Sequence, residues 1–264
     1  MDLQIHGKRA LISGSTAGIG YAIAQRLAAE GAAVCLNGRD PARLTAAVAR
    51  LQAEFPGVTV SGIAADLGTA AGCAALTAAL PEVDLLINNL GIFAPKAFLD
   101  IPDADWQRMF EVNVMSGVRL SRHYLPAMQA AGFGRIVFIS SESALQTPSE
   151  MVHYGTSKTA QLAVARGIAE GCIGGGVTVN SVLPGPTRSE GVVSFFAEWA
   201  ATQGISVADA EQAFFRSGRP SSLLRRFIEP AEVASLVAYL CSPLAAATHG
   251  AALRVDGGVV RSVA

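Results

Sequence analysis

The stretch "SGSTAGIG" at residues 13–20 decides the fold, because it joins an apolar run to a helical pattern. "RALIS" (9–13) precedes it, and "GYAIAQRLAAEG" (20–31) follows. Its three glycines permit backbone conformations that are closed to other residues, and they let a ligand approach closely. The helix that follows offers free N–H groups and a positive dipole end to a pyrophosphate. This context predicts a phosphate-binding strand–turn–helix unit; the alternative is a tight turn without a ligand.

Strand-like and helix-like segments then alternate to the end of the chain. The strand candidates are nearly continuous in Val, Ile, Leu and Ala, which suits a parallel sheet buried on both faces. Repeated strand–helix units predict one α/β domain over residues 1–264 with a Rossmann-type, doubly wound, mostly parallel sheet of seven strands and helices on both faces. Further strands are expected at 32–37, 58–66, 83–89, 134–141, 176–184 and 252–256, and helices at 40–54, 103–128, 150–172 and 230–242.

Composition limits the class of protein. The 264 residues are 51% hydrophobic and 16% charged, and the net charge is −1. A charged share of about 25% is typical, so a large core is indicated. We expect no nucleic-acid partner and no anionic membrane surface, because there is no basic field to attract them. The four cysteines are scattered and no long apolar run occurs, so we expect no disulfide framework, no metal and no membrane span, as in a cytoplasmic protein.

Residues 186–229 interrupt the alternation. They contain no good strand, but they carry several aromatic residues among helix formers. A long insertion of this kind after the sixth strand is often a lid over an active site. The alternative is an extra packing layer or a subunit contact. Among these aromatic residues are Phe195, Phe196, Trp199, Phe214 and Phe215.

Three further motifs follow the glycine-rich turn: "NNLG" (88–91), "YGTSK" (154–158) and "PGPT" (184–187). With these, in this order and at these spacings, the chain resembles the short-chain dehydrogenases/reductases over essentially its whole length. One departure is Leu90, where that family usually has alanine, and we expect altered packing beside the adenosine site.

The resemblance implies a set of residues that bind a nicotinamide dinucleotide. Asp66 would contact adenine, Asn88 and Gly91 would line the adenosine side, and Thr187 would meet the nicotinamide carboxamide. The full set implied is Gly14, Ser15, Thr16, Gly18, Ile19, Gly20, Arg39, Asp66, Leu67, Asn88, Gly91, Tyr154, Lys158, Pro184, Gly185 and Thr187.

The end of the second strand, "LNGRD" (36–40), bears on which dinucleotide binds. An acidic residue there binds the ribose 2′-hydroxyl, whereas an arginine accommodates a 2′-phosphate. Gly38 stands where relatives that use NAD carry aspartate, and Arg39 follows it, while Asp40 is better explained as a helix N-cap. Arg39 therefore favours NADP(H) over NAD(H). The alternative is an exposed arginine in a polar turn.

Tyr154 and Lys158 are four residues apart, so on a helix they share one face. A nearby ammonium favours the phenolate form of tyrosine, and a shift of two or three pKa units requires roughly 3–4 kcal/mol of differential stabilisation. The helix is expected to begin at "TPSE" (147–150), with Thr147 as N-cap and Glu150 completing a capping box. On an arbitrary helix, however, a tyrosine and a lysine four residues apart usually lie on the solvated surface and have no catalytic role.

Ser141, thirteen positions before Tyr154, falls where the family's substrate-orienting serine lies. Ser140 is its competitor, but neighbours on a strand point to opposite faces, so only one aims at the site. Asn113 matches the family's asparagine that holds a helix open and binds water. The resemblance therefore implies Asn113, Ser141, Tyr154 and Lys158 as catalytic residues.

The expected function is interconversion of a ketone or aldehyde with an alcohol, with Tyr154 as proton donor. The alternatives are a non-catalytic dinucleotide-binding sensor or scaffold, and a lyase or epimerase on the same fold. The substrate pocket is expected to be walled by the segment after Ser141, with Glu142, Glu150, Met151 and His153. By resemblance, a homodimer or homotetramer that pairs the helices 103–128 and 150–172 is expected.

Overall fold

The computed structural model describes residues 1–174 and 176–263. Within them, seven strands form one sheet in the order β3-β2-β1-β4-β5-β6-β7, and every pairing is parallel. The predicted doubly wound sheet is confirmed. The strands are β1 (Arg9–Ile12), β2 (Ala33–Gly38), β3 (Val60–Ala64), β4 (Leu85–Asn88), β5 (Gly134–Ile139), β6 (Val177–Pro184) and β7 (Ala252–Val255).

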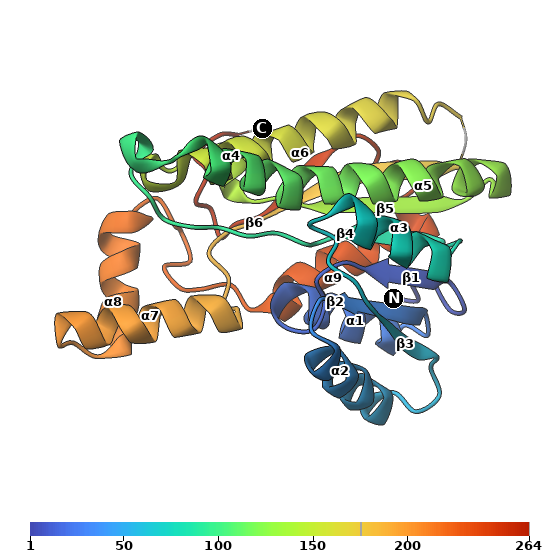
Figure 1. The fold of residues 1–264 in the computed structure, drawn as a ribbon, viewed down its shortest axis with the longest axis horizontal. Coiled ribbons are helices and arrows are strands. Elements are labelled where there is room, and N and C mark those ends of the chain that lie inside the picture. The colour runs from blue at the N-terminus through green and yellow to red at the C-terminus, as the bar shows by residue number, and fades with distance from the viewer. Residues whose placement is uncertain (175, 264) are drawn as a thin grey trace.

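Helices cover both faces of the sheet (Figure 1). Leu11 packs into the core on one face and Ile12 into the core on the other, because neighbouring strand residues point in opposite directions. This burial on both faces explains why the inner strands are apolar almost without interruption, whereas the two edge strands are more exposed. One face carries α1 (Gly18–Ala29), α2 (Pro41–Glu54) and α9 (Pro230–Cys241); the other carries α3 (Ala70–Ala79), α4 (Asp103–Phe110), α5 (Ser116–Ala131) and α6 (Val152–Glu170).

The predicted cap of α2 is confirmed, whereas that of α6 is wrong. Asp40 accepts hydrogen bonds from the backbone N–H groups of Ala42 and Arg43 at 2.8 and 3.1 Å. Thr147 caps nothing: its Oγ1 instead donates to the carbonyl of Ser143 at 3.2 Å. A short 3₁₀ turn over Ser149–Met151 follows, and α6 begins only at Val152.

The long helix expected at 103–128 is divided by a π-turn over Glu111–Met115. Gln161 Nε2 donates to the backbone carbonyl of Asn113 at 2.6 Å, so this carbonyl is bonded across to α6. A side chain that inserts into the backbone ladder in this way is a recognised cause of such a bulge.

Residues 186–229 form a separate helical layer beside the sheet, with α7 (Glu190–Gln203), α8 (Val207–Ala213) and a π-turn over Phe214–Gly218 (Figure 1). This layer has a small aromatic core of its own, in which Phe196, Phe215 and Phe227 are buried. Arg43 of α2 pairs with Glu190 of α7 at 3.1 Å and ties the layer to the first half of the sheet.

None of the helices within residues 1–174 and 176–263 is long and apolar enough to cross a membrane.

Candidate active site

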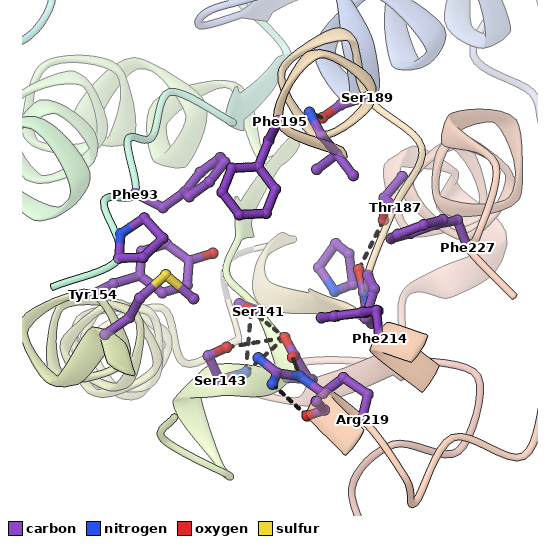
Figure 2. A pocket seen from close by; sticks show the side chains of 18 of the residues that line it. Phe93, Ser141, Ser143, Tyr154, Thr187, Ser189, Phe195, Phe214, Arg219 and Phe227 are labelled. Carbon is purple, nitrogen blue, oxygen red and sulfur yellow. Dashed lines mark hydrogen bonds and ion pairs between the residues drawn. The ribbon is translucent and has the colours of Figure 1, made fainter. Parts of the chain in front are cut away.

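A pocket of about 500 Å³ opens beyond the carboxyl ends of β5 and β6. Figure 2 shows Tyr154 and Phe93 on one side of it, Phe214 and Phe227 opposite, and Ser141 between them. Open α/β sheets bind their ligands at this edge. The pocket therefore lies where the fold is expected to hold a ligand, and the layer 186–229 supplies one of its walls.

Tyr154 and Lys158 lie side by side in α6, as their spacing predicts. Lys158 is only 4% exposed, and its Nζ donates to the carbonyl of Ile139 at 3.0 Å. This ammonium is 5.7 Å from the centre of the Tyr154 ring. Burial raises the pKa of Tyr154 to about 12 and lowers the pKa of Lys158 to about 8. Near pH 7 the phenol is therefore protonated and the lysine is mostly charged.

The two candidate serines differ in what their hydroxyls bind. Ser140 Oγ donates to the backbone carbonyl of Lys158 at 2.9 Å and so holds α6 against β5. Ser141 Oγ donates to Glu142 Oε2 at 2.5 Å, inside the pocket, and it lies close enough to lower the pKa of Tyr154 against the larger effect of burial. The geometry therefore favours Ser141 over Ser140 as the serine that meets a ligand.

Asn113 is fully buried behind the pocket and joins two segments. Its Oδ1 accepts from the N–H of Ile92 at 2.7 Å, and its Nδ2 donates to Ser157 Oγ at 2.9 Å. Gly91 lies beside it: a Cβ atom there would be 3.2 Å from Lys158 Nζ. The loop after β4 thus fits around the lysine ammonium, and Asn113 fixes that loop to α6.

An ion pair that the sequence did not reveal lies next to Ser141. Arg219 Nε donates to Glu142 Oε1 at 3.1 Å, and the two side chains are only 11% and 6% exposed. Arg219 Nη1 is also 3.5 Å from Glu150. No local pattern could have identified this pair, because 77 positions separate its partners. Phe93 and Phe227 also line the pocket, and no sequence motif pointed to either of them.

The expected pocket wall is confirmed for Glu142, Glu150 and Met151 and wrong for His153. His153 is 1% exposed and packs edge-on against Trp106, with ring centres 5.9 Å apart. Successive residues on a helix point about 100° apart, so the neighbour of Tyr154 faces away from the pocket. Burial lowers the pKa of His153.

The glycine-rich turn has the shape that a phosphate-binding loop requires. Gly14 and Gly18 have φ angles of +61° and +57°, which favour glycine. A Cβ at Gly20 would be 2.5 Å from Asn89 Nδ2. No side chain caps the first turn of α1, so its N–H groups are available to an anion. These features fit the pyrophosphate of a dinucleotide.

Other residues implied in cofactor binding are positioned by hydrogen bonds within the protein. Ser15 Oγ donates to the Ile12 carbonyl at 2.7 Å, and the Ser15 N–H donates to the Asn37 carbonyl at 2.8 Å, so both donors of Ser15 serve the turn itself. Thr187 Oγ1 donates to the Gly185 carbonyl at 2.9 Å. Asn88 Nδ2 donates to Ser121 at 3.1 Å, whereas its buried Oδ1 has no partner among the described residues. Ile19, Pro184, Gly185 and Thr187 all line the pocket.

At the end of β3, Asp66 is exposed and accepts from the N–H of Gly68 at 3.0 Å. Leu67 is 1% exposed and packs in the core, so its side chain faces away from any adenine. Leu90 packs against the phosphate turn: its Cα is 3.2 Å from where a Cβ of Gly14 would stand.

The end of β2 leaves a cation exposed beside the glycine-rich turn. Arg39 is exposed and forms no ion pair with any described residue. Gly38 lies against Thr16, because a Cβ at position 38 would be 2.5 Å from Thr16 Cγ2. Across residues 1–174 and 176–263, no three His, Cys, Asp or Glu side chains gather as metal ligands would.

Comparison with known proteins agrees with this geometry. Residues 14–260 match the family model described as Enoyl-(Acyl carrier protein) reductase. The chain is 48% identical over 263 residues to the "Uncharacterized oxidoreductase YvaG" of Bacillus subtilis, with 100% of both chains covered. It is 31% identical to the D-beta-hydroxybutyrate dehydrogenase of Cupriavidus necator, over 97% of this chain and 99% of that one. The structure of Gluconobacter frateurii L-sorbose reductase, complexed with NADPH and L-sorbose, superposes with a TM-score of 0.94 at 32% identity over 100% of both chains.

Proposed function

The chain belongs to the short-chain dehydrogenase/reductase family of NAD(P)-dependent oxidoreductases that act on carbonyl and alcohol groups, and we propose that it prefers NADP(H) and uses Tyr154 as its proton donor. The observation that carries this proposal is the convergence of Tyr154 and Ser141 on one pocket, with Lys158 buried behind them. The glycine-rich turn fits the dinucleotide, which supplies the hydride when bound.

In carbonyl reduction, the Ser141 hydroxyl would turn from Glu142 to donate a hydrogen bond to the substrate oxygen, and Tyr154 would donate a second one. Tyr154 would then transfer its proton as negative charge develops there. A pKa of about 12 keeps the phenol protonated before the reaction. Lys158 supports the phenolate that remains, because its ammonium is 5.7 Å from the ring.

Lys158, through water and Asn113, would pass on a proton from solvent that replaces the one given up by Tyr154. The amide group of Asn113 bonds Ile92 on one side and Ser157 on the other, so it keeps the loop after β4 beside the lysine. We propose that Lys158 also holds the cofactor ribose. With its pKa lowered to about 8, the lysine can release and regain a proton near neutral pH.

Arg39 supports the preference for NADP(H). Its guanidinium is exposed and has no carboxylate partner among the described residues, so it is free to pair with a 2′-phosphate. Gly38 supplies no acidic group to bind a 2′-hydroxyl. The L-sorbose reductase to which the chain is similar was crystallised with NADPH.

We further propose that the layer 186–229 closes over substrate as a lid, that the chain forms a homodimer or homotetramer, and that it works in the cytoplasm. The layer contributes α7, and the π-turn after α8, to the pocket wall, which supports a role in enclosing substrate. The exposed aromatic Phe110 on α4 supports a subunit contact there.

The test is reduction of a panel of ketones and aldehydes with NADPH and with NADH, by the wild type and Tyr154→Phe. We expect NADPH to give the higher kcat/KM, and Tyr154→Phe to abolish turnover while NADPH still binds. Arg39→Ala should lose most of the preference for NADPH. Unchanged turnover by Tyr154→Phe would exclude Tyr154 as the proton donor. If Arg39→Ala prefers NADPH as strongly as the wild type does, Arg39 does not determine the cofactor preference.

A further inference from the structure

The charged groups of the pocket bear on which substrates it accepts. Among the described residues that line it, three are charged: Glu142, Glu150 and Arg219. The single cation is already paired with both carboxylates, at 3.1 and 3.5 Å. This cluster carries a net charge of −1. Lys158 does not line the pocket, and its Nζ is bonded to the backbone carbonyl of Ile139.

The negative charge lies close to the reacting position. Glu142 Oε2 accepts from Ser141 Oγ at 2.5 Å, and Ser141 is the hydroxyl that is proposed to hold the substrate oxygen. A carboxylate on the carbon next to the carbonyl would therefore approach Glu142 in a pocket that offers no unpaired cation. Like charges repel strongly where water is excluded. An anionic substrate is disfavoured by this arrangement.

The same cluster leaves hydrogen-bonding groups available for an uncharged polar substituent. Glu142 Oε2 receives three donors, from Ser141 Oγ and from the N–H and Oγ of Ser143. Oε1 receives one donor, Arg219 Nε, so it can accept another. Arg219 Nη2 has no hydrogen-bond partner among the described residues. One acceptor and one donor suit a hydroxyl group.

The rest of the pocket lining is largely apolar and aromatic. Phe195 lies near Phe93 and Tyr154, whereas Phe214 and Phe227 lie on the other side, with Phe214 next to Arg219 (Figure 2). We propose that this pocket selects uncharged hydroxy ketones or hydroxy aldehydes and rejects the corresponding keto acids, with Glu142 and Arg219 as the specificity-determining pair. This inference rests on the proposed carbonyl reduction.

The test is two isosteric series of ketones reduced with NADPH: hydroxyacetone, 2-butanone and pyruvate, and 2-hydroxyacetophenone, propiophenone and phenylglyoxylate. In the wild type we expect each hydroxy ketone to exceed its apolar isostere in kcat/KM by about tenfold, because the site has polar groups to satisfy. We expect it to exceed the keto acid by about a hundredfold. The carbonyl of a keto acid is intrinsically more reactive, so a preference for the hydroxy ketone must come from the protein.

Glu142→Gln keeps the shape and acceptor of the side chain but removes its charge. We expect it to reduce the discrimination against keto acids by about tenfold, whereas Glu150→Gln, which is more exposed, has a smaller effect. Glu198→Gln, on the outer face of α7, is the matched control, and its ratios should equal those of the wild type. Ratios of kcat/KM within one variant cancel any general loss of activity.

Each outcome is decisive. If the wild type reduces keto acids as well as hydroxy ketones, and Tyr154→Phe reduces neither, the inference is wrong and the proposed function stands. If Glu142→Gln folds and keeps the wild-type ratio of kcat/KM for hydroxy ketone and keto acid, Glu142 does not determine specificity. If Glu142→Gln does not fold, the inference is tested by the wild type, which should prefer the hydroxy ketone, and by Glu150→Gln, which should weaken that preference slightly. If no carbonyl compound is reduced with either cofactor, the proposed function fails and this inference fails with it.

Discussion

Lys158 lies one helical turn after Tyr154, with its Nζ 5.7 Å from the centre of the tyrosine ring and bonded to the carbonyl of Ile139 at 3.0 Å. The ammonium is thus held beneath the phenol by the backbone of β5 and is almost fully buried. Burial of a charged group opposes folding. The same placement that would support the proposed phenolate at Tyr154 therefore lowers the stability of the protein.

Lys158→Met is expected to stabilise the fold at pH 7 while it abolishes activity. Burial lowers the pKa of Lys158 from 10.5 to about 8, which corresponds to a cost of about 3 kcal/mol for the charged form. Loss of the hydrogen bond to Ile139 offsets about 1 kcal/mol of this. We expect a net gain of about 2 kcal/mol in unfolding free energy, measured by urea denaturation.

The pH dependence of that gain provides its control. Between pH 8 and 10.5 the folded wild type binds fewer protons than the unfolded chain, so its stability rises with pH across this window. The advantage of Lys158→Met should therefore be complete below pH 8 and should disappear near pH 10.5. A gain that is constant from pH 7 to pH 10 would show that it arises from packing and not from charge.

Affinity for NADPH is expected to weaken as the pH rises through about 8. Lys158 loses its proton over this range and can no longer act as a charged donor to the cofactor. Fluorescence titration between pH 6 and 9.5 should show a dissociation constant that rises about tenfold per pH unit at the upper end. An affinity that is flat to pH 9.5 would contradict a charged role for Lys158 in cofactor binding.

The Glu142–Arg219 pair is expected to behave as a unit in stability. Arg219→Met leaves the carboxylate of Glu142 buried without its main counter-charge, which costs about 3 kcal/mol. Adding Glu142→Gln removes the unpaired charge, so the double variant should recover most of that loss. Thermal melts of the two single variants and the double variant measure the coupling. Strictly additive effects would mean that the two side chains do not stabilise each other.

Much of the fold follows from local pattern. The five inner strands are buried on both faces, so their apolar runs are long, and the turn at Gly14 and Gly18 uses φ angles that glycine favours. The spacing of Tyr154 and Lys158 places both on one face of a helix whatever surrounds it. These features depend on neighbours within a few residues, which is why they could be predicted.

The features that sequence reasoning missed depend on distant contacts. Thr147 was expected to cap α6, but a 3₁₀ turn over Ser149–Met151 intervenes, and α6 begins only at Val152. The π-turn around Asn113 depends on Gln161, and the charge balance of the pocket depends on Arg219. The hydrophobic periodicity of a sequence carries no information about contacts between residues so far apart in the chain. A capping motif or a helical run therefore predicts an element more reliably than its exact ends.

Conversion of the proposed cofactor preference is expected to require two substitutions. Gly38→Asp would supply an acidic group for the ribose 2′-hydroxyl, but its Cβ would be 2.5 Å from Thr16 Cγ2. Thr16→Ser removes that methyl group and keeps the hydroxyl. Gly38→Asp alone should therefore weaken both cofactors, whereas the double variant should gain NADH-dependent activity and lose NADPH-dependent activity.

The reason lies in the packing of the turn. Two carbon atoms cannot approach to 2.5 Å, so in the single variant either Thr16 or the end of β2 must move, and the phosphate turn moves with it. Ratios of kcat/KM for NADPH and NADH, measured for wild type, both single variants and the double variant, test this. Thr16→Ser alone should change the ratio little. If Gly38→Asp alone shifts the kcat/KM ratio toward NADH as far as the double variant does, the Thr16 side chain moves aside at little cost, and its methyl group does not restrict the choice of cofactor.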